Sequence, residues 1–239
     1  MRPQFLTSLS RRRRQAELKD QEGLGETEHF AALQGLARIN WLSRSDAILW
    51  PHIERLARAN RGSTIRVLDL ATGGGDVPIA LARRALRAHL NVRIDGCDVS
   101  QQAIAFASSK GAAAGLAVSF FTLDVLNQAL PAGYDVVTCS LFLHHLDDAD
   151  AGPFLRKAAD ATGRLLLIND LVRGPVAFAL AWSGCHLLSR SPVVRYDGPV
   201  SVAAAFSLAE ARMLAHRAGL CGASLVRRWP CRFLLSWSR

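Results

Sequence analysis

The sequence predicts a single α/β fold in which helices cover a mostly parallel sheet. From about residue 64 onward, short runs rich in Val, Ile and Leu alternate with helical patterns, as expected for strands joined by crossover helices. The first run, which begins at about Val67, breaks into three glycines at 73–75. Aspartates close the next two runs, at 92–98 and 118–123. With 239 residues, half of them apolar, the chain can form one enzyme-sized core with an added cap.

Residues 1–63 precede the first predicted strand, and two helical patterns there, over 30–41 and over 48–57, predict an N-terminal helical cap. The run Arg11-Arg12-Arg13-Arg14 follows the few apolar residues of the start instead of preceding them, which argues against a secretory signal. We expect these arginines to form a solvated helix face, not a clamp for nucleic acid or lipid. A cytoplasmic location is therefore expected, with association at a membrane surface left open.

The glycine-rich turn at 67–76, Val-Leu-Asp-Leu-Ala-Thr-Gly-Gly-Gly-Asp, predicts a ligand site between a buried strand and the helix at 77–88. A dinucleotide fingerprint does not fit, because its third glycine would fall on Asp76 or Pro78. A P-loop would need Lys and then Ser or Thr after the last glycine, where this chain has Asp76 and Val77. The Asp76 carboxylate also disfavours a pyrophosphate. A nucleotide-like cofactor without phosphate suits the turn better.

This turn resembles the first motif of the class I S-adenosylmethionine-dependent methyltransferases, of the small-molecule type similar to ubiquinone and menaquinone methyltransferase-domain proteins. The family motif runs apolar-apolar-acid-apolar-Gly-x-Gly-x-Gly, and Ala71 stands here in place of the first glycine. The resemblance implies a Rossmann-like, seven-stranded, mostly parallel sheet with helices on both faces and an antiparallel last strand. It implies S-adenosyl-L-methionine as the cofactor. It also implies that the cofactor's methionine end lies against Asp69, Ala71, Thr72, Gly73 and Gly75.

Two more strand ends carry the resemblance. An acid closing the second strand, Asp98, is placed to accept hydrogen bonds from both ribose hydroxyls, with Val99 beside it. By the same resemblance, Asp124 accepts from the adenine amino group, and the Val125 N–H faces a ring nitrogen. Ser100 can cap the helix at 101–114, and Asp124 can also act as a plain turn residue ahead of Leu126.

The fourth strand, 134–140, ends at Ser140, and the following segment contains His144 and His145. In the resembling family this position faces the transferred methyl group, so Ser140 is a further cofactor-site candidate. Histidine is the side chain most easily poised as a base near neutral pH, so either histidine is a candidate catalytic residue. A structural role for either is an equal alternative. Adjacent helical residues point about 100° apart, so we expect only one to face the acceptor.

A helix at 148–161 and a strand at 164–169 continue the alternation, and an apolar helix is predicted at 176–188. This helix covers the substrate pocket, lies on a membrane surface or is plain core; it is too short to span a bilayer. A capped helix from Ser207 and two strands at 220–229 and 231–238 complete the chain. The predicted organisation is a cap at 1–63 and a methyltransferase domain at 64–239 with a helical substrate-side insert at about 171–199. Caps of this kind close over the substrate in the family, which makes His29, Asn40 and Trp41 candidate substrate contacts.

The net charge of +9 lies in the segments 1–63 and 171–239, whereas 64–170 holds more acids than bases. Basic flanks suit phosphate or anionic lipid, although the Arg-rich composition explains the excess equally well. Five cysteines without a C-x-x-C pair predict reduced packing residues and no metal site.

The predicted reaction is methyl transfer to a small apolar acceptor, above all an oxygen of a phenol, hydroquinone or polyketide-type ring. An RNA methyltransferase and a non-catalytic cofactor-binding protein are the alternatives, though no recognisable RNA-binding module is present. Specific nucleic-acid binding is not expected, a peripheral membrane contact is left open, and the oligomeric state is not predicted.

Overall fold

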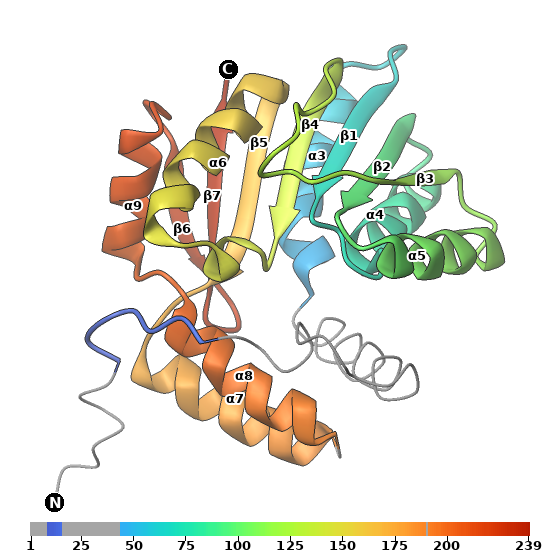
Figure 1. The fold of residues 1–239 in the computed structure, drawn as a ribbon. Helices are drawn as coiled ribbons and strands as arrows, with labels where there is room; N and C mark the ends of the chain where they lie inside the picture. Colours follow the sequence, from blue (N-terminus) through green and yellow to red (C-terminus); the bar gives the residue numbers. More distant parts are fainter. Residues whose placement is uncertain (1–8, 16–43, 190) are drawn as a thin grey trace, which may run out of the picture.

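The computed structural model describes residues 9–15, 44–189 and 191–239, which fold around a seven-stranded sheet of order β3-β2-β1-β4-β5-β7-β6 (Figure 1). The strands are β1 (Ile65–Leu70), β2 (Val92–Asp98), β3 (Val118–Thr122), β4 (Tyr134–Ser140), β5 (Thr162–Leu171), β6 (Ser224–Arg228) and β7 (Arg232–Ser238). The first five strands run parallel, and β7 is antiparallel to both β5 and β6. The predicted Rossmann-like sheet with an antiparallel last strand is thus confirmed.

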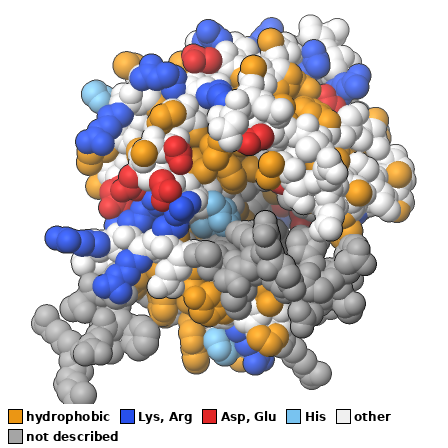
Figure 2. Space-filling model, in the orientation of Figure 1, with side chains coloured by type: hydrophobic (Ala, Val, Ile, Leu, Met, Phe, Trp, Pro, Cys, Tyr) orange, Lys and Arg blue, Asp and Glu red, His pale blue; other side chains and the backbone are white. Residues whose placement is uncertain are grey.

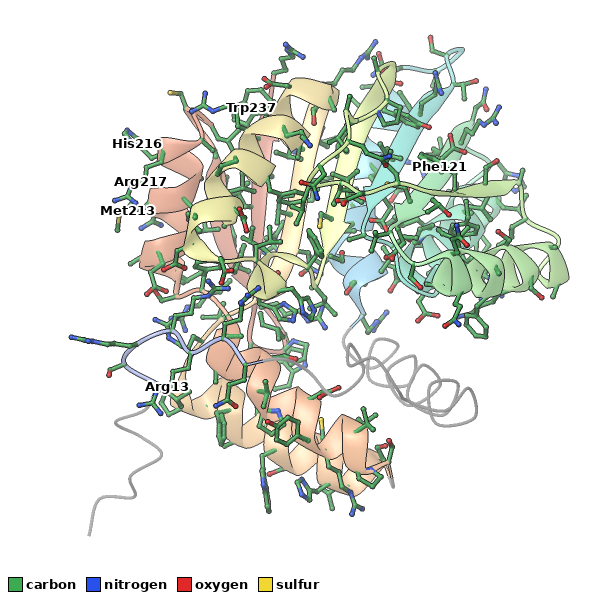
Figure 3. The ribbon with its side chains drawn as sticks, viewed as in Figure 1. Arg13, Phe121, Met213, His216, Arg217 and Trp237 are labelled. Carbon is green, nitrogen blue, oxygen red and sulfur yellow. The ribbon has the colours of Figure 1, made fainter. Side chains whose placement is uncertain are left out.

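Helices cover both faces of this sheet (Figure 1). One face carries α3 (Ser45–Ala59), α4 (Asp76–Arg87) and α5 (Gln101–Ala113), and the other carries α6 (Asp148–Ala161) and α9 (Leu208–Arg217). Each helix buries an apolar stripe, and the two resulting cores meet the alternate side chains of the central strands. The other side of α9, with Met213, His216 and Arg217, points away from the sheet (Figure 3).

The described helix of the predicted N-terminal cap is α3, which packs on the sheet beside α4. Ile48, Leu49 and Ile53 are buried there with strand residues such as Val67. The pattern at 30–41, with the candidate substrate contacts His29, Asn40 and Trp41, lies outside the described residues.

The predicted insert forms two helices, α7 (Pro175–Leu188) and α8 (Pro192–Ala204), which lie side by side below the sheet (Figure 1). The sequence did not predict α8 as a helix, because Gly198 and Pro199 interrupt its pattern. Gly198 allows the two helices to pack closely: a Cβ at this position would lie 2.2 Å from the Cys185 Sγ on α7. The two helices therefore form one unit at the edge where the parallel strands end.

The arginines of segment 9–15 do not form the predicted solvated helix face, because this segment is not helical. The side chain of Arg12 is only 10% exposed, and its guanidinium carbon lies 3.9 Å from the Phe206 ring centroid. It donates to the backbone oxygens of Ala204, His144 and Leu146 at 2.5–2.9 Å. Arg12 therefore ties the start of the chain to the segment after β4.

Candidate active site

A cavity of about 980 Å³ opens at the edge where the parallel strands end, between the sheet and the α7–α8 pair. The first group of lining residues comes from the ends of β1–β4, and the second comes from α7, α8 and the turn between β6 and β7. In the space-filling view, charged side chains and a histidine gather where the sheet domain meets these helices, whose surface is largely hydrophobic (Figure 2). The strand ends thus give the cavity a polar wall, and α7 and α8 give it a mostly apolar wall that also carries Asp197 and Ser201, while Arg232 of β7 lines the same cavity.

The glycine-rich turn forms the base of the polar wall and keeps the shape that the motif requires. Ala71 adopts φ = 52°, the left-handed region that glycine favours and that the family motif fills with glycine at this position. Gly73, at φ = 54°, has open space where a Cβ would lie. Its N–H donates to Asp98 Oδ2 at 2.8 Å, which joins the turn to the end of β2. Space for a ligand and a fixed backbone therefore occur together here.

Asp69 lies beneath this turn and is 2% exposed. Its Oδ1 accepts a 2.5 Å hydrogen bond from Thr138 Oγ1 on β4. Burial raises the pKa of Asp69 to about 6, against the lowering effect of hydroxyl donors. The carboxylate borders the cavity, so a cationic group bound there would favour its ionised form.

Asp98 lies at the cavity with one backbone donor on each carboxylate oxygen: Gly73 N–H on Oδ2 and Ser100 N–H on Oδ1. A carboxylate oxygen has two lone pairs, so each can accept one more hydrogen bond. Beside it, Val99 is 66% exposed and lines the same space, although such a side chain is usually buried. The pair offers acceptors for hydroxyls and an apolar surface for a ring.

Asp124 and Val125 form the next part of the wall. Asp124 accepts from the N–H groups of Leu126 and Asn127 and from the Asn127 amide, and these donors lower its pKa. Asp124 therefore acts as a turn residue. Its carboxylate still borders the cavity and has lone pairs that accept no hydrogen bond from these donors. Within the described part of the chain, the backbone N–H of Val125 donates no hydrogen bond. It is available to a ring nitrogen.

Other predicted cofactor residues separate into two groups. Thr72 and Ser140 line the cavity together with Ala71 and Gly73. Gly75 does not line it: a Cβ there would lie 2.8 Å from both Ala107 Cβ and Phe120 Cζ. Gly75 thus permits close packing of α4 against α5 and β3.

His144 is held by a buried carboxylate that the sequence did not single out. Its Nδ1 lies 2.7 Å from Asp170 Oδ1, and its backbone N–H donates to Asp170 Oδ2 at 3.1 Å. Burial acts to raise the pKa of Asp170, but the His144 ring and the surrounding N–H donors outweigh it, and the pKa lies below its usual value. An ionised carboxylate only accepts, so we assign the proton to Nδ1 and the basic lone pair to Nε2.

His145 follows in the same 3₁₀ turn, η2 (Leu143–His145), and also borders the cavity. Its ring centroid lies 4.2 Å from that of His144. Both histidines thus border the cavity from a single turn and not from the regular helix expected from the sequence. That only one of them faces the acceptor stays a prediction. Burial distinguishes the two: His144 is 4% exposed, whereas His145 is only partly buried.

Sequence reasoning missed Asp170, Arg232 and the turn at 229–231, all at the carboxyl end of β5 or beside it. Asp170 is a third acid at a strand end, after Asp98 and Asp124, and this pattern could have revealed it. Arg232 gave no signal in an Arg-rich segment. Among the described residues, no group of three or more His, Cys, Asp or Glu side chains is arranged to hold a metal ion.

Residues 67–163 match a family model described as a methyltransferase domain. The chain is similar to the ubiquinone biosynthesis O-methyltransferase of Xanthomonas euvesicatoria pv. vesicatoria, with 30% identity over 129 residues, 52% of this chain and 51% of that protein. A protein of the same name from Pseudomonas entomophila is 26% identical over 163 residues, 67% of this chain and 62% of that one. The chain thus spans about half to three-fifths of these relatives.

Two solved structures share the fold. The S-adenosylmethionine-dependent methyltransferase SibL, in its apo form, gives a TM-score of 0.66 at 21% identity, covering 94% of this chain and 62% of that one. Magnesium protoporphyrin IX methyltransferase ChlM from Synechocystis PCC 6803, with bound SAH, gives 0.56 at 19% identity, covering 92% and 91%.

Proposed function

Because the chain carries a class I S-adenosylmethionine-dependent methyltransferase domain, we propose that it transfers a methyl group from S-adenosylmethionine to an oxygen of a small, apolar aromatic acceptor. The observation that carries this proposal is that His144, held by the buried Asp170 carboxylate, lines the same cavity as the strand-end acids Asp98 and Asp124. A candidate base and a candidate cofactor site thus share one space.

The polar wall fits the cofactor. Asp98 offers acceptors to the ribose hydroxyls, and Val125 offers its N–H to the adenine ring. Asp69 places a carboxylate near the methionine end, where the cofactor is cationic. When bound, the cofactor supplies an electrophilic methyl group on a sulfonium. The chain must then align the acceptor oxygen and remove its proton.

His144 is placed to remove that proton. Asp170 fixes the ring and its tautomer, so Nε2 is the nitrogen that can take up a proton from a phenol. Asp170 stabilises the imidazolium that results. Because Asp170 acts through His144, it is a positioning residue.

The other wall of the cavity favours an apolar ring. Ala177, Leu180 and Ala181 of α7 and Val194 and Val202 of α8 line it. The outer side of α7 also exposes Val176, Trp182 and Leu187. We propose that the acceptor enters beside α7, either from solution or from a lipid surface. Across the described residues, the longest apolar helices fall short of the length needed to cross a bilayer.

RNA as the substrate is disfavoured by where the flanking arginines lie. Arg12, Arg173 and Arg232 come from the basic segments, yet all three lie largely inside the fold. Arg173 is bonded to Glu210, to the Ala205 carbonyl and to the Leu9 carbonyl. Arg12 and Arg173 therefore hold the chain together, and Arg232 lies inside the cavity and not on an outer surface that RNA phosphates could contact.

Incubation with methyl-labelled S-adenosylmethionine tests the proposal. The purified chain is given phenols in solution, the same phenols in phosphatidylglycerol vesicles, and total RNA at physiological salt. We expect label in the phenols, with the vesicle arm showing whether lipid presentation raises the rate. Label in RNA with none in phenols would reverse the assignment. Cofactor binding without transfer to any acceptor would favour a non-catalytic cofactor-binding protein.

A further inference from the structure

Arg232 is a buried cation at the cavity. It is the first residue of β7, lies opposite Leu171 of β5 and is 2% exposed. Both Arg232 and Leu171 line the cavity, together with Trp229, Pro230 and Cys231 of the preceding turn. A charged side chain in this position is costly unless other groups replace its hydration.

The described residues accept few of the hydrogen bonds that this guanidinium can donate. Nη1 donates to Ser45 Oγ at 2.7 Å, and Nε has no hydrogen-bond partner in the part of the chain that the structure describes. Within that same part, no carboxylate lies within 4.0 Å of the group. A guanidinium has five N–H donors, so the described residues leave most of its hydrogen-bonding capacity unused. Burial lowers the pKa of Arg232 to about 10, with the Asp170 charge acting against this, and the group therefore stays cationic at neutral pH.

The position of Arg232 indicates which ligand it faces. In the sheet, β4 and β5 lie between β7 and β1, so Arg232 is remote from the glycine-rich turn and from the ends of β2 and β3. At about 4.8 Å per strand, the separation from β1 is on the order of 14 Å. Arg232 directly follows the turn at 229–231 and pairs with Leu171 of β5, and these residues line the cavity together with the mostly apolar helices α7 and α8, which also contribute Asp197 and Ser201. This is the acceptor side.

We propose that Arg232 binds a carboxylate on the methyl acceptor, so that the substrate is an aromatic acid of the hydroxybenzoate or resorcylate type. A planar guanidinium pairs with a carboxylate through two parallel hydrogen bonds, which its unused N–H groups can supply. The apolar helices then contact the ring and its substituents, and the pairing fixes which edge of the ring points toward His144. This inference rests on the proposed function, since it names the class of acceptor for that same cavity.

A matched pair of ligands tests the inference without mutation. Calorimetry in saturating S-adenosylhomocysteine compares 2,4-dihydroxy-6-pentylbenzoate with 5-pentylresorcinol, which lacks only the carboxylate. We expect the acid to bind about 10–100-fold more tightly, the scale of a charge-assisted bidentate pair. Equal affinity, or no binding of either ring, overturns the inference. Failure of S-adenosylhomocysteine itself to bind would instead overturn the proposed function.

Three variants assign the preference to Arg232. Arg232→Gln removes the charge, and Arg232→Lys keeps the charge but loses the planar guanidinium that can make two parallel hydrogen bonds. Arg227→Gln is the control, because it removes an exposed charge from the same hairpin. We expect the preference for the acid to disappear in Arg232→Gln, to be weakened in Arg232→Lys and to persist in Arg227→Gln. Affinity for S-adenosylhomocysteine should change less than about 3-fold in all three. Arg232→Gln that keeps the preference but loses the cofactor would show that Arg232 binds the cofactor's own carboxylate, which overturns the proposal.

Discussion

The chemical role of a side chain in this cavity depends on the groups that it contacts, and His144 is the clearest case. The chain places two histidines side by side: His144 is buried against the Asp170 carboxylate, which fixes its ring, whereas His145 is only partly buried. His145 borders the same cavity, and its backbone oxygen accepts from Arg14 Nη1 at 2.6 Å. The contrast makes His145 a matched control for every test of His144.

We predict that His144→Gln lowers kcat by about 10²–10⁴-fold and leaves cofactor affinity unchanged, because it removes the base that takes up the acceptor's proton. We expect the wild-type rate to rise with pH, because a general base acts in its neutral form, and Asp170→Asn should lower kcat and alter that rise, since Asp170 contacts the His144 ring. His145→Gln should keep both rate and profile. Near-normal turnover with a flat pH profile in both His144→Gln and Asp170→Asn would show that the pair is structural.

Asp69 predicts a pH dependence of stability in the cofactor-free protein. Its pKa is raised from 3.8 when unfolded to about 6 when folded, so the folded state holds a proton that the unfolded state loses within this window. The free energy of unfolding that Asp69 contributes is therefore lost as pH rises from about 4 to 6, and the loss is complete above about pH 6. Asp69→Asn should be near neutral at pH 4 and stabilising by about 2–3 kcal/mol at pH 7.5.

Denaturant unfolding of both proteins across this range measures the effect. Parallel pH curves for wild type and Asp69→Asn would contradict it. The same variant should bind S-adenosylmethionine more weakly, because the carboxylate that faces the cation is lost.

At the scale of the elements, loops and short turns place the site, and glycines decide how closely the elements approach. Gly73 and Gly75 are two residues apart in one turn, both with positive φ. Open space surrounds the Cβ position of Gly73, whereas Ala107 and Phe120 crowd that of Gly75. The sequence assigned both glycines to the cofactor, and only the packing separates their roles.

Gly75→Ala should destabilise the fold by about 2–4 kcal/mol, from left-handed strain together with overpacking against α5. Gly73→Ala carries the strain alone, about 1–2 kcal/mol, and should instead reduce cofactor affinity by filling the open space. Thermal unfolding and calorimetry separate the two effects. A larger loss of stability in Gly73→Ala than in Gly75→Ala would contradict this division.

The segment at 9–15 also helps to hold the turn that carries the histidines. Arg12 donates hydrogen bonds to the backbone oxygens of His144 and Leu146, on either side of His145. Arg12→Ala should destabilise the protein by about 2 kcal/mol, from lost charge-assisted hydrogen bonds to carbonyls. Its exposed ion pair with Asp148 adds little. Arg13→Ala, whose side chain lies on the outside of the segment (Figure 3), should stay within about 0.5 kcal/mol of wild type in denaturant unfolding. Equal effects of the two changes would contradict the role of Arg12.

Across the whole molecule, most of the sheet was predictable because buried parallel strands are continuous apolar runs, as at 134–140. Asp98 and Asp124 were predictable because they close such runs at one edge. Asp170 was missed because the fifth strand was predicted to end at Asn169, although β5 extends to Leu171.

Long-range packing explains the other differences. Gly198 and Pro199 obscured α8, whose packing depends on Cys185 of a helix earlier in the chain. Arg12 and Arg232 could not be distinguished from solvated arginines, because their burial depends on Phe206 and Ser45, far away in the sequence. Local pattern therefore predicted the cavity residues at the ends of β1–β4, and it did not predict those of α8 and of the turn between β6 and β7.

Titration of the chain with S-adenosylhomocysteine by calorimetry tests the central claim most directly. Wild type should bind one equivalent, and Asp98→Ala should bind about 10–150-fold more weakly, since it removes the ribose acceptors and the anchor of the Gly73 N–H. Asp160→Ala, an exposed acid outside the cavity, should bind like wild type. No binding to wild type, or unchanged affinity in folded Asp98→Ala, would contradict the account.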